Sequence, residues 1–397
     1  MGRAKQMMIE DENRGYSLPN ENKSLCADLY QDPYLRQYII SHSHKGKCSY
    51  TNKYTDVISL EEFIEYVMLK IYAHYTTPDN DDLYLEKSFY DDPEEIIPGL
   101  KRVNGYVTRE NAELFDSKEE LLENIGLISK SDTLNNDIIA CIHNDTWIQK
   151  DSMVKTKHEE LSDIWKQFVK MVTHQRRFTF YVLPEFDDLY FSSENGLQDI
   201  LSELSNAIRN LLLYKPLSVN STIYRCRYVE NTNEVETFEQ ITSPPNDKAS
   251  ENRMNPAGIS MFYGAFNDNT AKIEAKDSEK KVCVVAQFAV KRDLVVLDLT
   301  ELPPLSFWND YWQELAFIYS FSKEISKPIV KNQGPYEYVP TQIFAEYIRF
   351  CCSDLKGHDI DGIIFNSSKC RSKNIVLFYD QKKSQDVLIL ENITHYE

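Results

Sequence analysis

The sequence predicts an α+β protein in which a mainly helical part, residues 1–215, precedes a mostly antiparallel, β-rich part, residues 216–397. In much of the first part, apolar residues recur at the spacing of a helix. After Pro216, which cannot continue a helix, the pattern changes to short apolar runs rich in β-branched residues. Hydrophobic residues make up 42% of the chain and charged residues 27%, which is ordinary globular composition.

The N-terminal part begins with a polar stretch, and its first strong helical pattern spans residues 60–75. There Leu60, Phe63 and Val67 fall on one helical face. An acidic run at 79–95, with eight acidic residues and one lysine, indicates a solvated loop. Alternating residues at 178–186 indicate a strand or an extended connector. The other helices predicted in this part span 109–115, 118–126, 136–144, 159–175 and 197–214.

The C-terminal part is predicted to form seven strands and three helices. Strands at this density with few helices favour an antiparallel α+β domain over alternating βαβ units. The predicted strands span 222–229, 259–266, 281–290, 293–299, 361–365, 374–380 and 386–392, and the helices span 269–277, 309–321 and 340–354. We place the domain boundary between residues 215 and 216.

The net charge disfavours nucleic acid as a partner. It is 44 − 62 = −18, and affinity for phosphate backbones comes largely from Lys and Arg. Residues 216–397 carry 20 − 25 = −5, and the first 215 carry the remaining −13, so the C-terminal part is the better host for an anionic small molecule. Glycine-rich nucleotide loops of the G-x-G-x-x-G or G-x-x-x-x-G-K-[ST] type do not occur.

Location and redox state are expected to be those of a cytoplasmic protein. The chain shows no signal-peptide pattern and no apolar run of membrane-spanning length, so we expect no membrane partner. The eight cysteines are scattered without a C-x-x-C pair, which indicates reduced thiols.

A metal site is not expected, although four residues of suitable type lie close in sequence. Cys26, His42, His44 and Cys48 are potential zinc ligands. The positions that would complete two zinc knuckles hold Leu29 and Thr51 instead, so zinc binding by these residues stays open. Arg36 and His42 also fit a loose R-x₄₋₆-H nuclease pattern, which arises often by chance.

The β-rich part carries a set of polar residues, spaced across several strands, whose types suit binding of a phosphate and of a flat ring. Arginines at strand ends bind phosphates in bidentate fashion, and a tyrosine stacks on a flat ring. A carboxylate between them stabilises a cationic sugar centre. The candidates are Arg225, Arg253, Tyr263, Glu274 and Ser367.

An ordered series of short motifs resembles the RES-domain family, which is named for its Arg, Glu and Ser. The motifs are I-Y-R-C-R from residue 223, N-R-M-N-P-A-G from 252, M-F-Y-G-A from 261, T-A-K-I-E from 270, Y-V-P-T-Q from 338, D-G-I-I-F-N-S-S from 361 and N-I-V-L-F from 374. The front half is similar to the HEPN-associated N-terminal region of some RES proteins. Its start, at about 20–55, looks like a degenerate zinc ribbon.

The resemblance implies a split β-core like that of ADP-ribosyltransferases, which grips NAD⁺ as a substrate. Arg225 would contact the diphosphate or an attacking phosphate, and Arg253 would be the second phosphate-binding arginine. Tyr263 would stack near the nicotinamide. Glu274 and Ser367 would be the motif glutamate and serine. Arg227 competes with Arg225 for the first role, and Ser368 with Ser367 for the last.

The implied activity is cleavage of the nicotinamide–ribose bond, by phosphorolysis with inorganic phosphate as co-substrate or by hydrolysis, without a metal. A toxin or defence effector of this kind implies an antitoxin or regulatory protein as partner. The alternatives are a mono-ADP-ribosyltransferase that acts on a protein and a catalytically inactive NAD-binding regulatory protein. Residues 1–215 are expected to be a regulatory or partner-binding domain without catalysis of their own.

Overall fold

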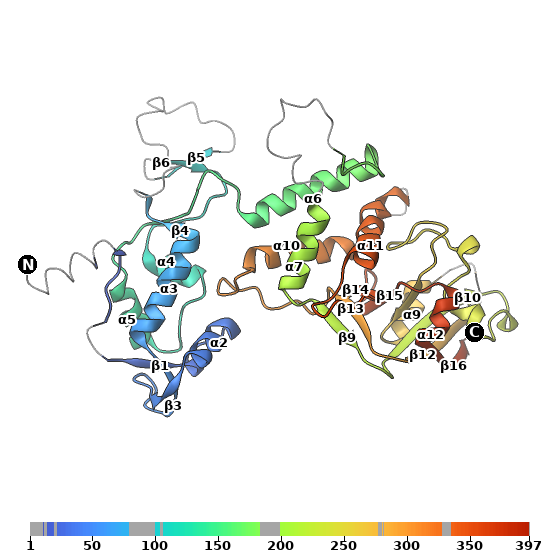
Figure 1. Cartoon of the computed structure of the whole chain (residues 1–397), viewed down its shortest axis with the longest axis horizontal. Coiled ribbons are helices and arrows are strands. Elements are labelled where there is room, and N and C mark those ends of the chain that lie inside the picture. The colour runs from blue at the N-terminus through green and yellow to red at the C-terminus, as the bar shows by residue number, and fades with distance from the viewer. Residues whose placement is uncertain are drawn as a thin grey trace, which may run out of the picture. The chain divides into compact units, whose positions relative to one another are not determined.

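The computed structural model describes residues 11, 14–19, 22–78, 100–103, 106–182, 199–276, 280, 282–327 and 335–396. The chain forms two compact units, drawn in Figure 1. The N-terminal unit comprises Met1–Thr156 and Leu305–Trp312, and the C-terminal unit comprises Lys157–Pro304 and Gln313–Glu397. The acidic run at 79–95 lies outside the described residues. None of the described helices is long and apolar enough to cross a membrane.

The N-terminal unit combines helices with small sheets. Its sheets have the strand orders β1-β3-β2, β4-β8-β7 and β5-β6. Its helices are α2 (Pro33–Ser41), α3 (Leu60–His74), α4 (Lys118–Asn124) and α5 (Asp132–Cys141). Its strands are β1 (Ser24–Cys26), β2 (His44–Lys47), β3 (Tyr54–Ser59), β4 (Tyr75–Thr76), β5 (Leu100–Val103), β6 (Tyr106–Arg109), β7 (Leu114–Phe115) and β8 (Trp147–Gln149), and Ala27–Leu29 forms the 3₁₀ turn η1.

Helix α3 confirms the strongest helical prediction of the sequence. The Ser59 hydroxyl caps its N-terminus by accepting the Glu62 backbone N–H at 3.1 Å. The acidic first turn and His74 in the last turn match the helix dipole. Phe63 and Val67 are completely buried in the core of the unit. The predicted helix at 109–115 is wrong, because this stretch ends β6, makes a turn and enters the short strand β7.

The C-terminal unit has an eight-stranded sheet with helices on it. The described strand order is β16-β12-β10-β11-β15-β14-β13-β9, and every pair in it is antiparallel except β13–β14. This confirms the predicted α+β class. The strands are β9 (Tyr214–Leu217), β10 (Thr222–Val229), β11 (Phe262–Ala265), β12 (Val282–Val290), β13 (Leu294–Asp298), β14 (Gly362–Asn366), β15 (Lys373–Leu377) and β16 (Leu388–Tyr396).

The helices of this unit begin with α6 and α7, which precede the sheet in the sequence. They are α6 (Lys157–His174), α7 (Ile200–Asn210), α8 (Phe238–Ile241), α9 (Asp268–Ala275), α10 (Trp312–Ile325, whose first residue is counted with the N-terminal unit), α11 (Val339–Cys351) and α12 (Gln381–Val387), with 3₁₀ turns η4 (Thr232–Glu234), η5 (Asn246–Lys248) and η6 (Pro335–Tyr338). The predicted strand or connector at 178–186 is described only to residue 182, where the chain forms turns.

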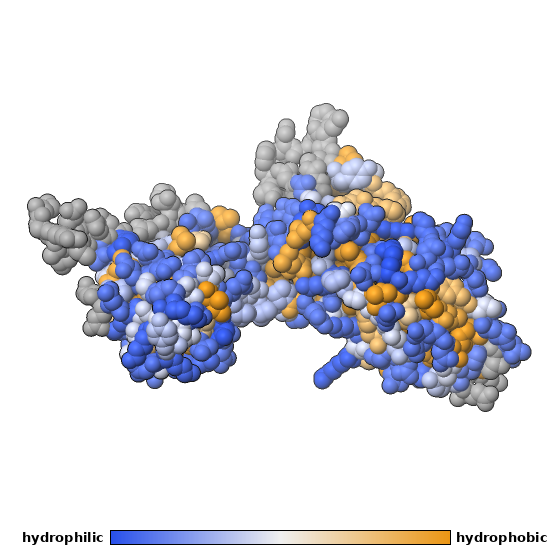
Figure 2. Space-filling model, turned by 60° about the horizontal axis from the view of Figure 1, so that its bottom comes forward, coloured by the Kyte–Doolittle hydropathy of each residue, from blue (hydrophilic) through white to orange (hydrophobic). Residues whose placement is uncertain are grey.

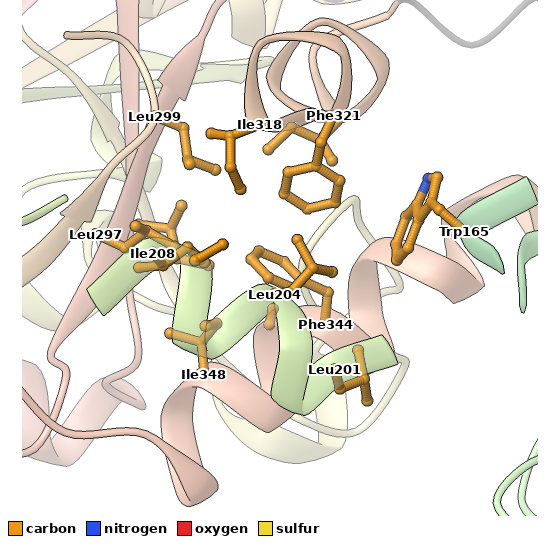
Figure 3. Packing of buried hydrophobic residues seen from close by; sticks show 14 of the residues in the cluster. Trp165, Leu201, Leu204, Ile208, Leu297, Leu299, Ile318, Phe321, Phe344 and Ile348 are labelled. Atoms are coloured by element: carbon orange, nitrogen blue, oxygen red, sulfur yellow. The ribbon is translucent and has the colours of Figure 1, made fainter. Parts of the chain in front are cut away.

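The largest core of the C-terminal unit joins α6, α7, α10 and α11 to one face of the sheet. Figure 3 shows Leu204 and Ile208 of α7 among side chains from β13, α10 and α11. Trp165 of α6 meets Phe321 of α10 edge to face at 5.0 Å. A second cluster, with Ile223 at its centre, covers the opposite face of the sheet.

The compact units divide at Thr156/Lys157, whereas the sequence places the domain boundary at 215/216. The physical reason for the difference is that the apolar stripes of α6 and α7 are buried in the sheet-containing unit. The boundary at 215/216 stays a prediction, and a truncation experiment described below tests it. On the face drawn in Figure 2, hydrophilic residues predominate and hydrophobic residues reach the surface in patches.

Candidate functional site

A cavity of about 530 Å³ lies beside strands β10 and β11, which share few backbone contacts. Strand β10 pairs with β12 over eight residues but with β11 through a single pair, Tyr224 and Ala265. Beyond that pair the two strands diverge, and residues of both line the cavity. Gly264 permits the close approach at the pair, because a Cβ atom there would clash with the Ile223 side chain and lie 3.1 Å from the Tyr224 carbonyl oxygen. The volume is in the usual range for small-ligand sites.

Glu274 lies on the wall of this cavity, in the last turn of the short helix α9. Asn267 caps that helix by accepting the Thr270 backbone N–H at 2.8 Å. The Glu274 side chain is 26% exposed. Its Oε1 accepts hydrogen bonds from the Ser367 hydroxyl at 2.5 Å and from the Asn374 amide at 2.8 Å. The carboxylate is therefore held from two sides and keeps an accessible face.

The two candidate serines take different places. Ser367 contacts Glu274, and its Oγ also accepts the backbone N–H groups of Lys369 and Cys370, each at 3.1 Å. Because the Ser367 oxygen accepts from both of these N–H groups, the hydroxyl hydrogen of Ser367 is the one that is donated to the Glu274 carboxylate. Ser368, by contrast, lines the cavity, and Ser367 is not among the lining residues.

The structure also separates Arg225 from Arg227. Arg225 lines the cavity, donates to the Tyr263 carbonyl oxygen at 2.7 Å, and lies over the Phe262 ring at 5.4 Å. Burial, with a smaller contribution from the Arg227 charge, lowers the pKa of Arg225 to about 10, so it stays a cation at neutral pH. Arg227 is exposed and donates to the Gln240 carbonyl oxygen, outside the cavity lining.

Arg253 lines the cavity and is at the same time anchored to the backbone. Its two terminal nitrogens donate to the carbonyl oxygens of Ile325 at 2.5 Å and Lys327 at 2.7 Å. Within the described part of the chain these hydrogen bonds use two of the five guanidinium N–H donors. Its guanidinium lies 5.7 Å from the centre of the Tyr338 ring, and burial lowers its pKa.

Tyr263 lies on β11 and lines the same cavity as the two arginines. Its hydroxyl donates to Asn255 Oδ1 at 2.7 Å and accepts the Met254 backbone N–H at 3.1 Å. Burial raises the pKa of this phenol, so the group stays neutral. With its polar end used inside the protein, the ring is what Tyr263 presents as a contact surface.

Three polar residues of the site were missed by the sequence analysis. Asn374 is buried, and its Oδ1 has no hydrogen-bond partner among the described residues. Lys369 donates to the Glu274 carbonyl oxygen at 2.7 Å and lies 3.8 Å from its carboxylate. Gln342 donates to the carbonyl oxygens of Asn252 and Asn255 and so holds the loop that carries Arg253. The N-I-V-L-F and Y-V-P-T-Q motifs contain Asn374 and Gln342, but their strand and helix patterns gave no sign of these contacts.

The potential zinc ligands do not assemble in the described part of the chain, where no group of three or more His, Cys, Asp or Glu residues is placed to hold a metal ion. Cys26 Sγ lies 3.9 Å from the Thr51 hydroxyl, and the buried Cys48 is its neighbour. His42 stacks instead on Tyr38 at 4.2 Å. Arg36 donates to the carbonyl oxygens of Ala27 and Tyr30, so the loose nuclease pattern is part of local packing.

The fold and the cavity together define an α+β domain whose sheet has a single residue pair between β10 and β11. The cavity there offers two guanidinium groups and one carboxylate held by hydrogen bonds. The RES domain family matches residues 222–396, and HEPN/RES N-terminal domain 1 matches residues 41–185. The chain is a RES-domain protein with a HEPN/RES N-terminal domain, and the RES match indicates an NAD-related activity. The two matches lie on either side of the predicted boundary at 215/216. Neither a curated protein nor a solved structure matches the chain.

Proposed function

We propose that this protein is an NAD⁺-degrading enzyme that cleaves the nicotinamide–ribose bond. The observation that carries the proposal is the Glu274 carboxylate, which Ser367 and Asn374 hold on the wall of a cavity that also contains Arg225 and Arg253. A fixed negative charge suits a positively charged sugar, and fixed guanidinium groups suit a diphosphate. Both kinds of charge line the same cavity.

In the proposed reaction, the bond between ribose C1″ and the nicotinamide nitrogen breaks, and its electron pair goes to the nitrogen. Nicotinamide leaves as a neutral molecule because it was cationic in NAD⁺, so no general acid is required. The ribose passes through an oxocarbenium-like state, which the Glu274 carboxylate stabilises. Phosphate oxygen then bonds to C1″ in phosphorolysis. In hydrolysis water does so and loses a proton.

The other lining residues receive binding roles in this proposal. Arg225 and Arg253 hold the diphosphate, or one of them holds attacking phosphate. Tyr263 offers its ring to the nicotinamide. Asn374 Oδ1, which has no hydrogen-bond partner among the described residues, accepts a hydrogen bond from a ribose hydroxyl or from the nicotinamide carboxamide. Ser367 is a positioning residue, since it acts through Glu274.

Conservative replacement of Arg225 is expected to weaken NAD⁺ binding. Arg225→Lys keeps the charge but loses the planar fork, so the Kd for NAD⁺ should rise about 10- to 100-fold. Isothermal titration with NAD⁺ measures it in full-length protein that also carries Glu274→Gln, because that variant is expected to bind NAD⁺ with little turnover. Arg227→Lys is the matched control, because Arg227 lies two residues away on the same strand and outside the cavity. An unchanged Kd in Arg225→Lys would show that this arginine contributes only to the structure.

Replacing the two serines separately is expected to give different kinetic signatures. Ser367→Ala removes the hydroxyl that holds Glu274. Because this hydrogen bond is made to a charged group, kcat should fall about tenfold or more, whereas KM should stay nearly unchanged. Ser367→Thr keeps the hydroxyl and should recover most of the rate. Ser368→Ala should change KM, because Ser368 lines the cavity. Equal kcat values for Ser367→Ala and the unmodified protein would exclude the positioning role.

The main alternative is a mono-ADP-ribosyltransferase that acts on a protein, since it needs the same grip on NAD⁺. To distinguish the two, purified protein is incubated with NAD⁺ in the presence and absence of phosphate, and the products are identified by mass spectrometry. ADP-ribose 1″-phosphate indicates phosphorolysis and ADP-ribose indicates hydrolysis. Labelled protein without free ADP-ribose would support the transferase. Intact NAD⁺ in all reactions would contradict the proposal.

The biological setting is part of the same proposal. An enzyme that consumes NAD⁺ in the cytoplasm is harmful to its own cell when unrestrained, so we place this one among toxins or defence effectors. We propose that residues 1–215 regulate it or bind a partner, such as an antitoxin, without catalysis of their own, while the helices α6 and α7 of this part also complete the core of the C-terminal unit. Cleavage of RNA by the protein, dependent on Arg36 and His42, would contradict this part.

A further inference from the structure

A second, larger groove of about 1120 Å³ lies on the C-terminal unit, apart from the cavity that contains Glu274. Strands β14 and β15 connect the two places. The groove is lined by Asp361, just before β14, and by Phe378, just after β15. The cavity is lined by Phe365 of β14 and Asn374 of β15, near the opposite ends of these strands. The groove therefore has its own set of residues and no part in the proposed cleavage.

The groove is basic, in contrast to the acidic chain. Its lining includes six Lys or Arg residues and four Asp residues. Three of the four carboxylates already accept hydrogen bonds from protein donors. Asp293 accepts the Val219 backbone N–H, Asp354 accepts from His358, and Asp361 accepts from Arg292, Tyr379 and the Val295 backbone. Arg292 and Asp361 form an ion pair, which leaves five Lys or Arg residues against three Asp residues, so the lining has a net positive charge.

Two of the arginines are partly buried without an ion-pair partner among the described residues. Arg349 lies over the rings of Phe350 at 4.8 Å and Phe378 at 6.0 Å, and burial lowers its pKa. Arg209 has a buried Nε that meets no acceptor in the described part of the chain. Partly desolvated guanidinium groups are costly when unpaired. Both guanidinium groups line the groove, where an anion could pair with them.

The same groove exposes large apolar side chains beside these cations. Phe350 and Leu355 are each 69% exposed, and Leu212 is 55% exposed. Leu212 also adopts a left-handed backbone conformation (φ 54°), which is unfavourable for leucine. Phosphate groups alone make no use of such side chains, whereas apolar residues of a peptide do.

We propose that this groove is a docking site for an acidic, amphipathic peptide segment of a protein partner. Carboxylates of the peptide would pair with Arg209 and Arg349 and with the exposed Lys356 and Lys383, and its apolar residues would cover the exposed leucines and Phe350. Nucleic acid fits less well. One face of the Phe350 ring is already taken by Arg349, the other exposed apolar side chains are aliphatic, and the chain carries −18 overall.

Peptide display on the full-length protein tests the proposal. A library of random short peptides is selected on the immobilised protein, and the enriched sequences are synthesised with a fluorescent label. The selected peptides should combine Asp or Glu with Leu, Ile or Phe. The Lys356→Glu/Lys383→Glu variant should weaken their binding about tenfold or more, and Leu355→Ser should weaken it as well. Lys323→Glu is the matched control, because Lys323 is exposed on α10 outside the groove and its variant should bind normally.

Three results would overturn the proposal. The first is a selection without a common acidic and apolar composition. The second is equal affinity for the groove variants and the Lys323→Glu control, with all variants matching the unmodified protein in thermal unfolding midpoint. The third is tighter binding of a labelled single-stranded oligo-dT than of every selected peptide, with loss in the same variants, which would make the groove a nucleic-acid site.

Discussion

The Glu274→Gln protein is expected to bind NAD⁺ and to cleave it about 10²–10³-fold more slowly than the unmodified protein. A rate loss of this size is typical when one group that stabilises transition-state charge is removed. The substitution keeps the shape of the side chain and removes its negative charge. The Gln amide oxygen can still accept the hydrogen bonds that Ser367 and Asn374 donate, so the wall of the cavity keeps its contacts. Steady-state production of nicotinamide measures kcat, and calorimetric titration measures NAD⁺ affinity.

The matched control is Glu230→Gln, because Glu230 is exposed just past the end of β10 and does not line the cavity. It should retain full turnover. Both variants should unfold at the temperature of the unmodified protein. A Glu274→Gln protein with near-normal kcat would remove Glu274 from the reaction. A variant that loses NAD⁺ binding and turnover together would assign it to binding.

The strand pattern of the C-terminal part could be predicted because alternation and β-branched runs are local properties. The order in which the strands pair could not be predicted. In the sheet β10 lies between β11 and β12, and no local property of the sequence shows which edge of β10 each of these strands contacts. The prediction at 109–115 failed because a short amphipathic stretch fits a turn between two strands as well as a helix.

For the candidate site, the sequence motifs identified the types of residue but not the residues that each side chain contacts. Arg225 and Arg227 are equivalent in the sequence, and only the sheet shows that Arg225 faces the cleft while Arg227 reaches Gln240. Ser367 and Ser368 differ in the same way. Asn374 was missed because a polar residue that begins an apolar strand looks like an ordinary strand end, and its contact with Glu274 joins positions 100 residues apart.

A truncated chain of residues 216–397 is expected not to fold. It lacks α6 and α7, whose apolar side chains belong to the main core of the C-terminal unit. Buried large side chains contribute about 1.5–3 kcal/mol each, so losing those of two helices removes about 15 kcal/mol or more. Domains are stable by about 5–15 kcal/mol in all. The large side chains lost, from these helices and the residues that follow α7, are Leu161, Ile164, Trp165, Phe168, Met171, Val172, Ile200, Leu201, Leu204, Ile208, Leu211 and Leu213.

A chain of residues 157–397 is the matched comparison, because it keeps both helices. In both truncated chains Phe307 and Trp308 are replaced by Ser, since these residues pack within the N-terminal unit and would otherwise be left uncovered. Circular dichroism and thermal unfolding should show a cooperative transition for 157–397 and none for 216–397. Point variants of the full chain give an independent measure, as Leu204→Ala should cost about 2–5 kcal/mol in the free energy of unfolding of this unit. Cooperative folding of 216–397 would support the boundary at 215/216 and make α6 and α7 an appendage of the RES domain instead of part of its core.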